Sequence, residues 1–320
     1  MPSSYPAHGL ERDAWILARR PQRNPLSPSR PYAFFVEDEY SVSRDLVRVS
    51  TVFLTNRECP WHCLMCDLWR NTLADPVPRG AIAAQIDYAL QRLPPARQIK
   101  LYNSGSFFDV QAIPLADHPS IASQVEGFER VIVESHPALV GENCLRFRDR
   151  LNASLEVAMG LETSHPEILA RLNKRMTVEQ FAGAAAFLRE QDIDLRVFIL
   201  VKPPFMREHE ALVWAQRSLE FAFDCGATAA TLIPTRAGNG ALEELAAEGE
   251  FSPPRLATLE AAMAYGLGLR RGRVFADLWD AGTTRACPHC DDLRILRLRA
   301  MNLRQTILEP ISCACCEAHT

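Results

Sequence analysis

The run Glu58-Cys59-Pro60-Trp61-His62-Cys63-Leu64-Met65-Cys66-Asp67 is the most informative stretch of this 320-residue chain. Its three cysteines have the spacing C-x3-C-x2-C, which indicates metal ligation. Three thiolates in one short loop can bind three irons of a cubic iron-sulfur cluster and leave the fourth iron open for a substrate or cofactor. A zinc site completed by His62 is the alternative. The loop therefore predicts a metal centre.

The residues around this loop predict an α/β fold. Residues 49–54 are β-branched and apolar, and they predict a short strand that ends directly before the cysteines. Further strands are predicted over residues 99–102, 130–133, 155–160, 195–201, 228–233 and 274–278. Between them, helical periodicity covers residues 80–93, 143–151, 178–190, 207–223 and 254–267. Alternating strands and helices predict parallel β/α units, and six or seven units favour a partial (β/α)6 TIM-like barrel.

Composition divides the chain into three parts. Residues 1–47 are rich in proline and predict an irregular N-terminal extension. Residues 48–280 carry the predicted barrel, and residues 281–320 form a small cysteine-rich segment expected to bind a metal. With 48% hydrophobic and 23% charged residues, the chain can bury a large core.

Charge and hydropathy limit the classes of partner. The formal net charge of -4 gives no overall attraction to nucleic acid or to an anionic membrane. No stretch approaches the roughly 18 apolar residues of a membrane span, and no basic segment leads into an apolar run at the N-terminus. We therefore expect a soluble cytoplasmic protein without a membrane partner. In a reducing compartment, ten cysteines that gather mainly in two clusters indicate metal ligation rather than disulfides.

Polar residues follow the ends of several predicted strands. Ser104-Gly105-Ser106 follows the second strand, and Glu134, Glu162 and Lys202 follow later ones, with Lys174 in a loop beyond Glu162. In parallel barrels such residues converge at the C-terminal ends of the strands, where the chemistry takes place. Only three of the 35 lysine and arginine residues are lysine. A lysine where arginine is the rule indicates a site that needs a compact ammonium group.

Together these segments resemble the radical S-adenosylmethionine (SAM) superfamily. The resemblance spans roughly residues 48–278 and is closest to the branch that contains the elongator acetyltransferase subunit, the tRNA methylthiotransferases and the radical SAM subunit of archaeosine synthase (RaSEA). The segments that carry it, besides the cysteine loop, are Asn103-Ser104-Gly105-Ser106-Phe107, Val133-Glu134-Ser135, Asn173-Lys174, Lys202-Pro203-Pro204-Phe205 and Phe251-Ser252-Pro253-Pro254.

The resemblance implies that Cys59, Cys63 and Cys66 ligate a 4Fe-4S cluster that binds SAM. It further implies reductive cleavage of SAM to a 5'-deoxyadenosyl radical, which abstracts hydrogen from a substrate, with tRNA base modification as the preferred function. The implied partners are tRNA and an external electron donor of the flavodoxin or ferredoxin type. A radical SAM reaction on a small metabolite or peptide is the first alternative. A non-catalytic zinc-binding interaction protein is the second.

The resemblance also implies the residues that hold SAM. The Ser104-Gly105-Ser106 turn would bind the methionine amino group, and Glu162 would bind the ribose. Lys174 would lie near the methionine carboxylate and form a charge-assisted hydrogen bond. Lys202 is a further candidate for cofactor binding, and a salt bridge at the end of its strand is the alternative. His136 stands where tRNA-modifying relatives often have arginine, so the substrate stays open.

A second cysteine cluster lies beyond the barrel. Cys287-Pro288-His289-Cys290 is followed after 22 residues by Cys313-Ala314-Cys315-Cys316. Four thiolates can close a tetrahedral zinc site, which we expect first, or hold an auxiliary iron-sulfur cluster. The absence of any metal is the remaining alternative. The fourth ligand is either Cys315 or Cys316, and the spacing does not choose between them.

The segment between the two cysteine pairs has a helical pattern. Arg294, Arg297 and Arg304 fall on one stripe, while Leu293 and Leu296 are available to pack inward. The stripe is the best candidate for a surface that binds a polyanion. A solvated cationic face is the alternative.

Overall fold

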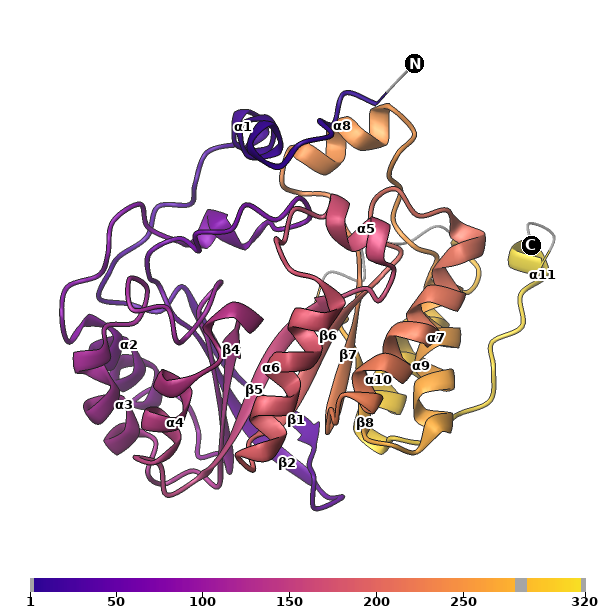
Figure 1. Cartoon of the computed structure of the whole chain (residues 1–320). Coiled ribbons are helices and arrows are strands. Elements are labelled where there is room, and N and C mark those ends of the chain that lie inside the picture. Colours follow the sequence, from indigo (N-terminus) through magenta and orange to yellow (C-terminus); the bar gives the residue numbers. More distant parts are fainter. Residues whose placement is uncertain (1–2, 280–286, 318–320) are drawn as a thin grey trace.

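The computed structural model describes residues 3–279 and 287–317, in which eight strands form one curled sheet in the order β1-β2-β3-β4-β5-β6-β7-β8 (Figure 1). β1 (Ala33–Tyr40) is antiparallel to β2, and all other neighbours are parallel. The parallel strands are β2 (Leu46–Phe53), β3 (Gln98–Tyr102), β4 (Arg130–Ser135), β5 (Ser154–Glu162), β6 (Asp194–Val201), β7 (Ala229–Pro234) and β8 (Arg273–Ala276). The partial barrel predicted from the sequence is confirmed.

Helices cover the outer face of the sheet (Figure 1). They are α2 (Ala81–Leu90), α3 (His118–Gln124), α4 (Glu142–Arg148), α6 (Val178–Glu190), α7 (Glu208–Asp224) and α9 (Leu256–Leu269). Three short helices, α1 (Gly9–Arg19), α5 (Pro166–Arg171) and α8 (Ala241–Ala247), lie beyond the C-terminal ends of the strands. In the described part of the chain, no helix combines the length and the apolar character that crossing a bilayer requires.

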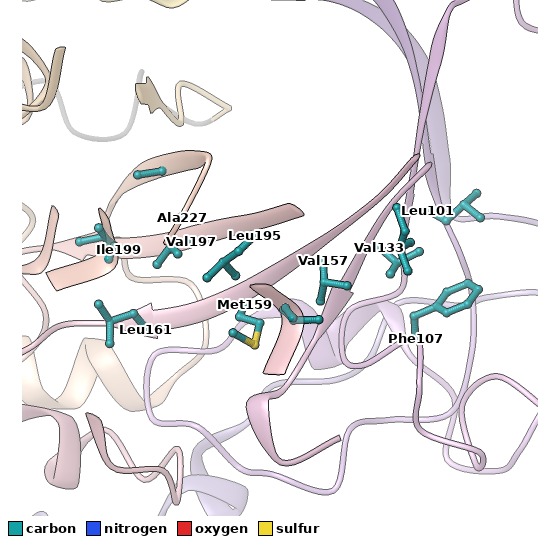
Figure 2. Packing of buried hydrophobic residues seen from close by; sticks show 14 of the residues in the cluster. Leu101, Phe107, Val133, Val157, Met159, Leu161, Leu195, Val197, Ile199 and Ala227 are labelled. Carbon is teal, nitrogen blue, oxygen red and sulfur yellow. The ribbon is translucent and has the colours of Figure 1, made fainter. Parts of the chain in front are cut away.

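The main hydrophobic core lies between the sheet and these outer helices. Figure 2 shows Val157, Met159 and Leu161 at alternate positions of β5, and all three are fully buried. Because successive side chains of a strand point to opposite faces, the intervening residues face the barrel interior. The sheet therefore separates an apolar outer layer from a differently composed interior.

Charged residues fill the interior near the start of the strands. Glu156 is completely buried, and it accepts hydrogen bonds from Arg196 Nε at 2.6 Å, Arg273 Nη2 at 2.8 Å and Arg130 Nη1 at 3.2 Å. Burial alone would raise the pKa of this carboxyl group, but the surrounding guanidinium groups hold the pKa at about 2. Glu39 of β1 also binds Arg196, at 2.6 Å. This ion network ties the antiparallel edge of the sheet to its centre.

The structure corrects the predicted irregularity of residues 1–47, which contain α1 and β1. In β1, Glu37 and Glu39 both contact Lys100 of β3, at 2.8 and 2.6 Å. A buried strand is usually recognised by apolar residues at alternate positions. In β1 these positions are acidic because they pair with a lysine in the interior, so the sequence pattern did not predict the strand. The predicted boundary between residues 280 and 281 lies outside the described residues.

We expect Glu156→Gln to destabilise the protein by about 3–5 kcal/mol, because it leaves buried guanidinium groups without a neutralising charge. Glu142→Gln is the matched control. The exposed Glu142 pairs with Arg146 at 2.5 Å, and loss of such a pair changes stability by about 0.5 kcal/mol or less. Urea unfolding of both variants measures the difference. Equal midpoints would contradict a structural role for the network.

Candidate active site at the C-terminal ends of the strands

The cysteine loop follows β2, and other strand ends hold it in place. Leu64 N donates to Leu172 O at 2.9 Å, and Asn239 Nδ2 donates to Leu64 O at 2.7 Å and to Cys66 O at 3.3 Å. Burial raises the pKa of the thiols of Cys59, Cys63 and Cys66 to about 12. Thiols in such surroundings need a bound metal to become thiolates.

The spread of this triad fits a cluster better than a single ion. Among the described residues, Cys59, Cys63 and Cys66 do not form a group whose ligand atoms all lie within 4.8 Å of one another. A zinc ion with Zn–S bonds of about 2.3 Å would draw its sulfurs to about 3.8 Å. In an iron-sulfur cube each thiolate binds a different iron. Three thiols from one loop are the donor set that such a cluster uses, and the assignment of Cys59, Cys63 and Cys66 as its ligands stays a prediction.

The turn after β3 packs directly on the first cysteine. A Cβ on Gly105 would lie 3.3 Å from Cys59 Cβ, and Ser104 has a left-handed φ of 54°. Glu134, at the end of β4, accepts hydrogen bonds from Asn103 N at 2.6 Å and from Gly105 N at 3.3 Å. Burial raises the pKa of Glu134 to about 7, although these backbone donors oppose the shift. Glu134 is thus the residue that shapes the turn, rather than an ordinary carboxylate at a strand end.

His136 joins the cysteine loop to the segment that carries Lys174. Its ring stacks on Trp61 with the centroids 3.8 Å apart and an interplanar angle of 9°. Ala138 N donates to Nδ1 at 3.2 Å, so Nε2 carries the proton and donates to Lys174 O at 3.1 Å. Burial, together with the nearby Lys174 charge, lowers the pKa of His136 to about 4. The ring is therefore a neutral packing group.

Glu162 and Lys174 lie together as a buried ion pair, with Lys174 Nζ 2.5 Å from Glu162 Oε1. Burial opposes the ammonium charge, but Glu162 together with the nearby Cys63 and Cys59 raises the pKa of Lys174. Gly160 leaves space for the pair, since a Cβ there would lie 2.1 Å from Glu162 Oε1 and 2.5 Å from Lys174 Nζ. Glu162 itself has a φ of 66° beside an irregularity in the β5–β6 register. The structure thus brings together two residues predicted to contact SAM.

Lys202 has a different environment. Its Nζ lies 2.6 Å from Ser252 Oγ, 3.3 Å from Pro253 O and 3.1 Å from Glu208 Oε2. These three protein acceptors match the three protons of an ammonium group. The geometry therefore favours the salt bridge at the strand end over cofactor binding by Lys202.

Two residues that hold the site were not identified from the sequence. Asn239 lies in a Gly-Asn-Gly segment, a composition typical of a plain turn, and its position after a predicted strand is the signal that the sequence offers. Asp13 of α1 accepts a hydrogen bond from Asn173 Nδ2 at 2.7 Å, and the same Nδ2 donates to His62 O at 2.8 Å. No local pattern connects Asp13 with the cysteine loop.

The prediction of a surface that binds a polyanion is wrong for two of the three arginines in the stripe. Arg294 and Arg297 are buried and pair with the buried Glu260 of α9, Arg297 at 2.9 Å. Leu293 and Leu296, expected to pack inward, are 53% and 58% exposed. The helix that carries these residues, α10 (Asp291–Arg304), therefore turns its arginines inward and its leucines outward. It does so because the buried carboxylate of Glu260 binds the arginines.

The chain is similar to known proteins in sequence and in fold. No protein-family model matches the chain. An uncharacterized protein of Methanocaldococcus jannaschii is 23% identical over 92% of this chain and 87% of that protein. Archaeosine synthase subunit beta of Methanosarcina acetivorans is 28% identical over 64% of this chain, and the match spans 63% of that relative's length. Methylornithine synthase has a similar fold, with a TM-score of 0.52 and 14% identity over 77% of this chain and 70% of that chain.

The relative named archaeosine synthase subunit beta belongs to the branch that the cysteine loop and the strand-end residues predicted, and the fold neighbour shares the partial barrel. The predicted family resemblance is therefore confirmed. The alternative of a non-catalytic zinc-binding interaction protein is wrong.

We expect Gly160→Ala to push Glu162 and Lys174 apart and to destabilise the protein by about 1–3 kcal/mol, because both side chains are buried at this point. Gly183→Ala is the control, since a Cβ on Gly183, in α6, would meet nothing within 4 Å. That change should be neutral or stabilising by up to about 1 kcal/mol. Urea unfolding compares the two, and a Gly160→Ala protein as stable as the control would refute the tight fit.

Proposed function

We propose that this chain is a radical SAM enzyme in which Cys59, Cys63 and Cys66 bind a 4Fe-4S cluster next to a SAM site. The observation that carries the proposal is the convergence of three features at one end of the barrel. These are the cysteine loop, the Ser104-Gly105-Ser106 turn packed on Cys59, and the buried Glu162–Lys174 pair. With SAM bound, such a cluster would supply the electron that cleaves SAM and yields a 5'-deoxyadenosyl radical. This radical would abstract hydrogen from the substrate.

The protein residues would position the cofactor and exclude water. Glu134 and the neutral His136 fix the turn and the Lys174 segment through main-chain hydrogen bonds. Lys174 would present its ammonium to the methionine carboxylate, and the turn would receive the methionine amino group. Glu162 would accept hydrogen bonds from the ribose. Binding would then exchange part of an internal ion pair for contacts with SAM.

We further propose a tRNA base as the substrate, with an external flavodoxin or ferredoxin as the electron donor. Support for tRNA comes from two sequence relatives named archaeosine synthase subunit beta, from Methanosarcina acetivorans and Thermococcus kodakarensis. The second candidate is a small metabolite or peptide. It is favoured by the burial of Arg294 and Arg297, which removes two cations from the expected RNA-binding surface.

We expect Cys59→Ala to abolish the formation of 5'-deoxyadenosine, because one iron of the cluster loses its ligand. The protein would be reconstituted anaerobically with iron and sulfide, reduced chemically and assayed with SAM by chromatography. Cys225→Ala is the control, since Cys225 lies between α7 and β7, away from the cysteine loop. Undiminished product from Cys59→Ala, or no product from the reconstituted unaltered protein, would sink the radical proposal.

If tRNA is the substrate, the reconstituted protein should bind total tRNA at about 50 mM salt. The affinity should fall at least about tenfold at about 200 mM, because each phosphate contact releases counterions. Filter binding measures both, with duplex DNA of similar length as the polyanion control. Absence of binding at about 50 mM, or equal binding to the DNA, would favour a metabolite or peptide.

A further inference from the structure

The sulfur atoms of the second cysteine cluster lie close enough to share one ion. Cys287 Sγ is 3.8 Å from Cys313 Sγ, and Cys290 Sγ is 3.5 Å from Cys316 Sγ. All four sulfurs lie within 4.8 Å of one another. A tetrahedral zinc ion with Zn–S bonds of about 2.3 Å requires sulfurs about 3.8 Å apart. In a cubic cluster the four thiolates bind four different irons, so they lie farther apart than around one ion.

The geometry also chooses the fourth ligand. Cys316 is part of the sulfur group, while Cys315 is exposed and is not. A backbone hydrogen bond from Cys316 N to Cys313 O, at 3.0 Å, turns the C-x-C-C segment so that the first and last cysteines reach the same point. Residues Ala314–Glu317 form this turn as the short helix α11.

Groups around the sulfurs orient the site. Arg294 Nε donates to Cys290 Sγ at 3.3 Å, and the same guanidinium donates through Nη2 to Ile311 O at 2.9 Å. Asp291 Oδ2 accepts from Cys287 N at 2.6 Å. A cation beside a thiolate and a carboxylate that holds the main chain of a ligand residue are the kind of outer contacts that structural metal sites use to fix their ligands. We propose that Cys287, Cys290, Cys313 and Cys316 form a closed structural zinc site that clasps α10 (Asp291–Arg304) against the open edge of the barrel.

The last turn of α10 and the residue after it connect the metal site to β8 by hydrogen bonds. Asn302 Oδ1 accepts from Ala276 N at 2.8 Å and its Nδ2 donates to Ala276 O at 2.9 Å. Gln305 makes the same pair of contacts with Val274 N and O, at 2.7 and 2.8 Å. Two side-chain amides therefore occupy backbone groups on the outer edge of β8, which would otherwise offer a free edge for strand pairing.

Arg294 links the two ends of this arrangement. It contacts Cys290 at the metal site and pairs with Glu260 on α9, and α9 packs against β7 and β8. The buried Glu260 has a second partner in Arg297. Arg294 and Arg297 bind the 305–313 segment through the carbonyls of Ile311 and Leu308. Loss of the metal would remove the additional attachment of this segment at Cys313 and so loosen it. The metal site thus stabilises the edge strand.

The metal can be identified independently of the proposed catalytic cluster. In a Cys59→Ala, Cys63→Ala, Cys66→Ala background, any bound metal belongs to the second site. We expect about one zinc per chain and no iron, by elemental analysis. Iron and sulfide in this background would overturn the proposal. Cobalt(II) added to the intact, zinc-stripped chain provides a second measurement, and a spectrum without tetrahedral thiolate absorption would also overturn it.

Cys316→Ala and Cys315→Ala form a matched pair. We expect Cys316→Ala to lose the zinc and to lower Tm, while Cys315→Ala keeps both unchanged. Removal of zinc from the unaltered chain with a chelator should accelerate amide hydrogen exchange at Val274 and Ala276 by at least about tenfold relative to β5, because the edge opens. A Cys315→Ala protein without zinc would refute the choice of Cys316 as the fourth ligand. Unchanged amide hydrogen exchange at β8 after zinc removal would refute the stabilisation of the edge strand by the metal site.

Discussion

The ion network around Glu156 is the constraint on which the arrangement of the barrel depends. A fully buried carboxylate needs neighbouring positive charges, and Arg196 of the adjacent β6 and Arg273 of the edge strand β8 provide them. Arg196 in turn binds Glu39 on the antiparallel edge. These contacts can form together only if the sheet is curled, so the charges in the interior help to set its curvature. They also fill the lower interior and leave the C-terminal ends of the strands for the site.

At those ends, the polar groups organise one another. Glu134 fixes the turn beside Cys59, and His136 joins Trp61 of the cysteine loop to Lys174. Lys174 is paired with Glu162 above Gly160. The groups come from the ends of β4 and β5 and from the loops that carry Trp61 and Lys174, and each is held by a neighbour. A site with fixed partners loses little conformational entropy on binding, which is what a cofactor-dependent reaction requires of the protein.

Sequence patterns predicted the parallel strands, the main outer helices and the cysteine loop because these features depend on local periodicity and spacing. Of the predicted residues 49–54, for example, residues 49–53 form the C-terminal part of β2. Contacts between distant segments were not predictable in this way. Helical periodicity placed Arg294 and Arg297 on one stripe, but only Glu260 on α9 determines that this stripe is buried. Likewise β1 was missed because its acidic residues face an ionic interior.

The two cysteine groups show how spacing in three dimensions separates two kinds of metal chemistry. In the first group, three cysteines come from one loop, their sulfurs are not drawn together, and adjacent strand ends supply polar groups for a ligand. Such an arrangement leaves a coordination position open. In the second group, four sulfurs from two segments lie within 4.8 Å, and Arg294 and Asp291 occupy the surroundings. A site with four protein ligands has no open position, so its contribution is to stability. In the proposed arrangement, a metal with four protein ligands fixes the exposed edge of the barrel, and the candidate active site lies at the strand ends of that same barrel.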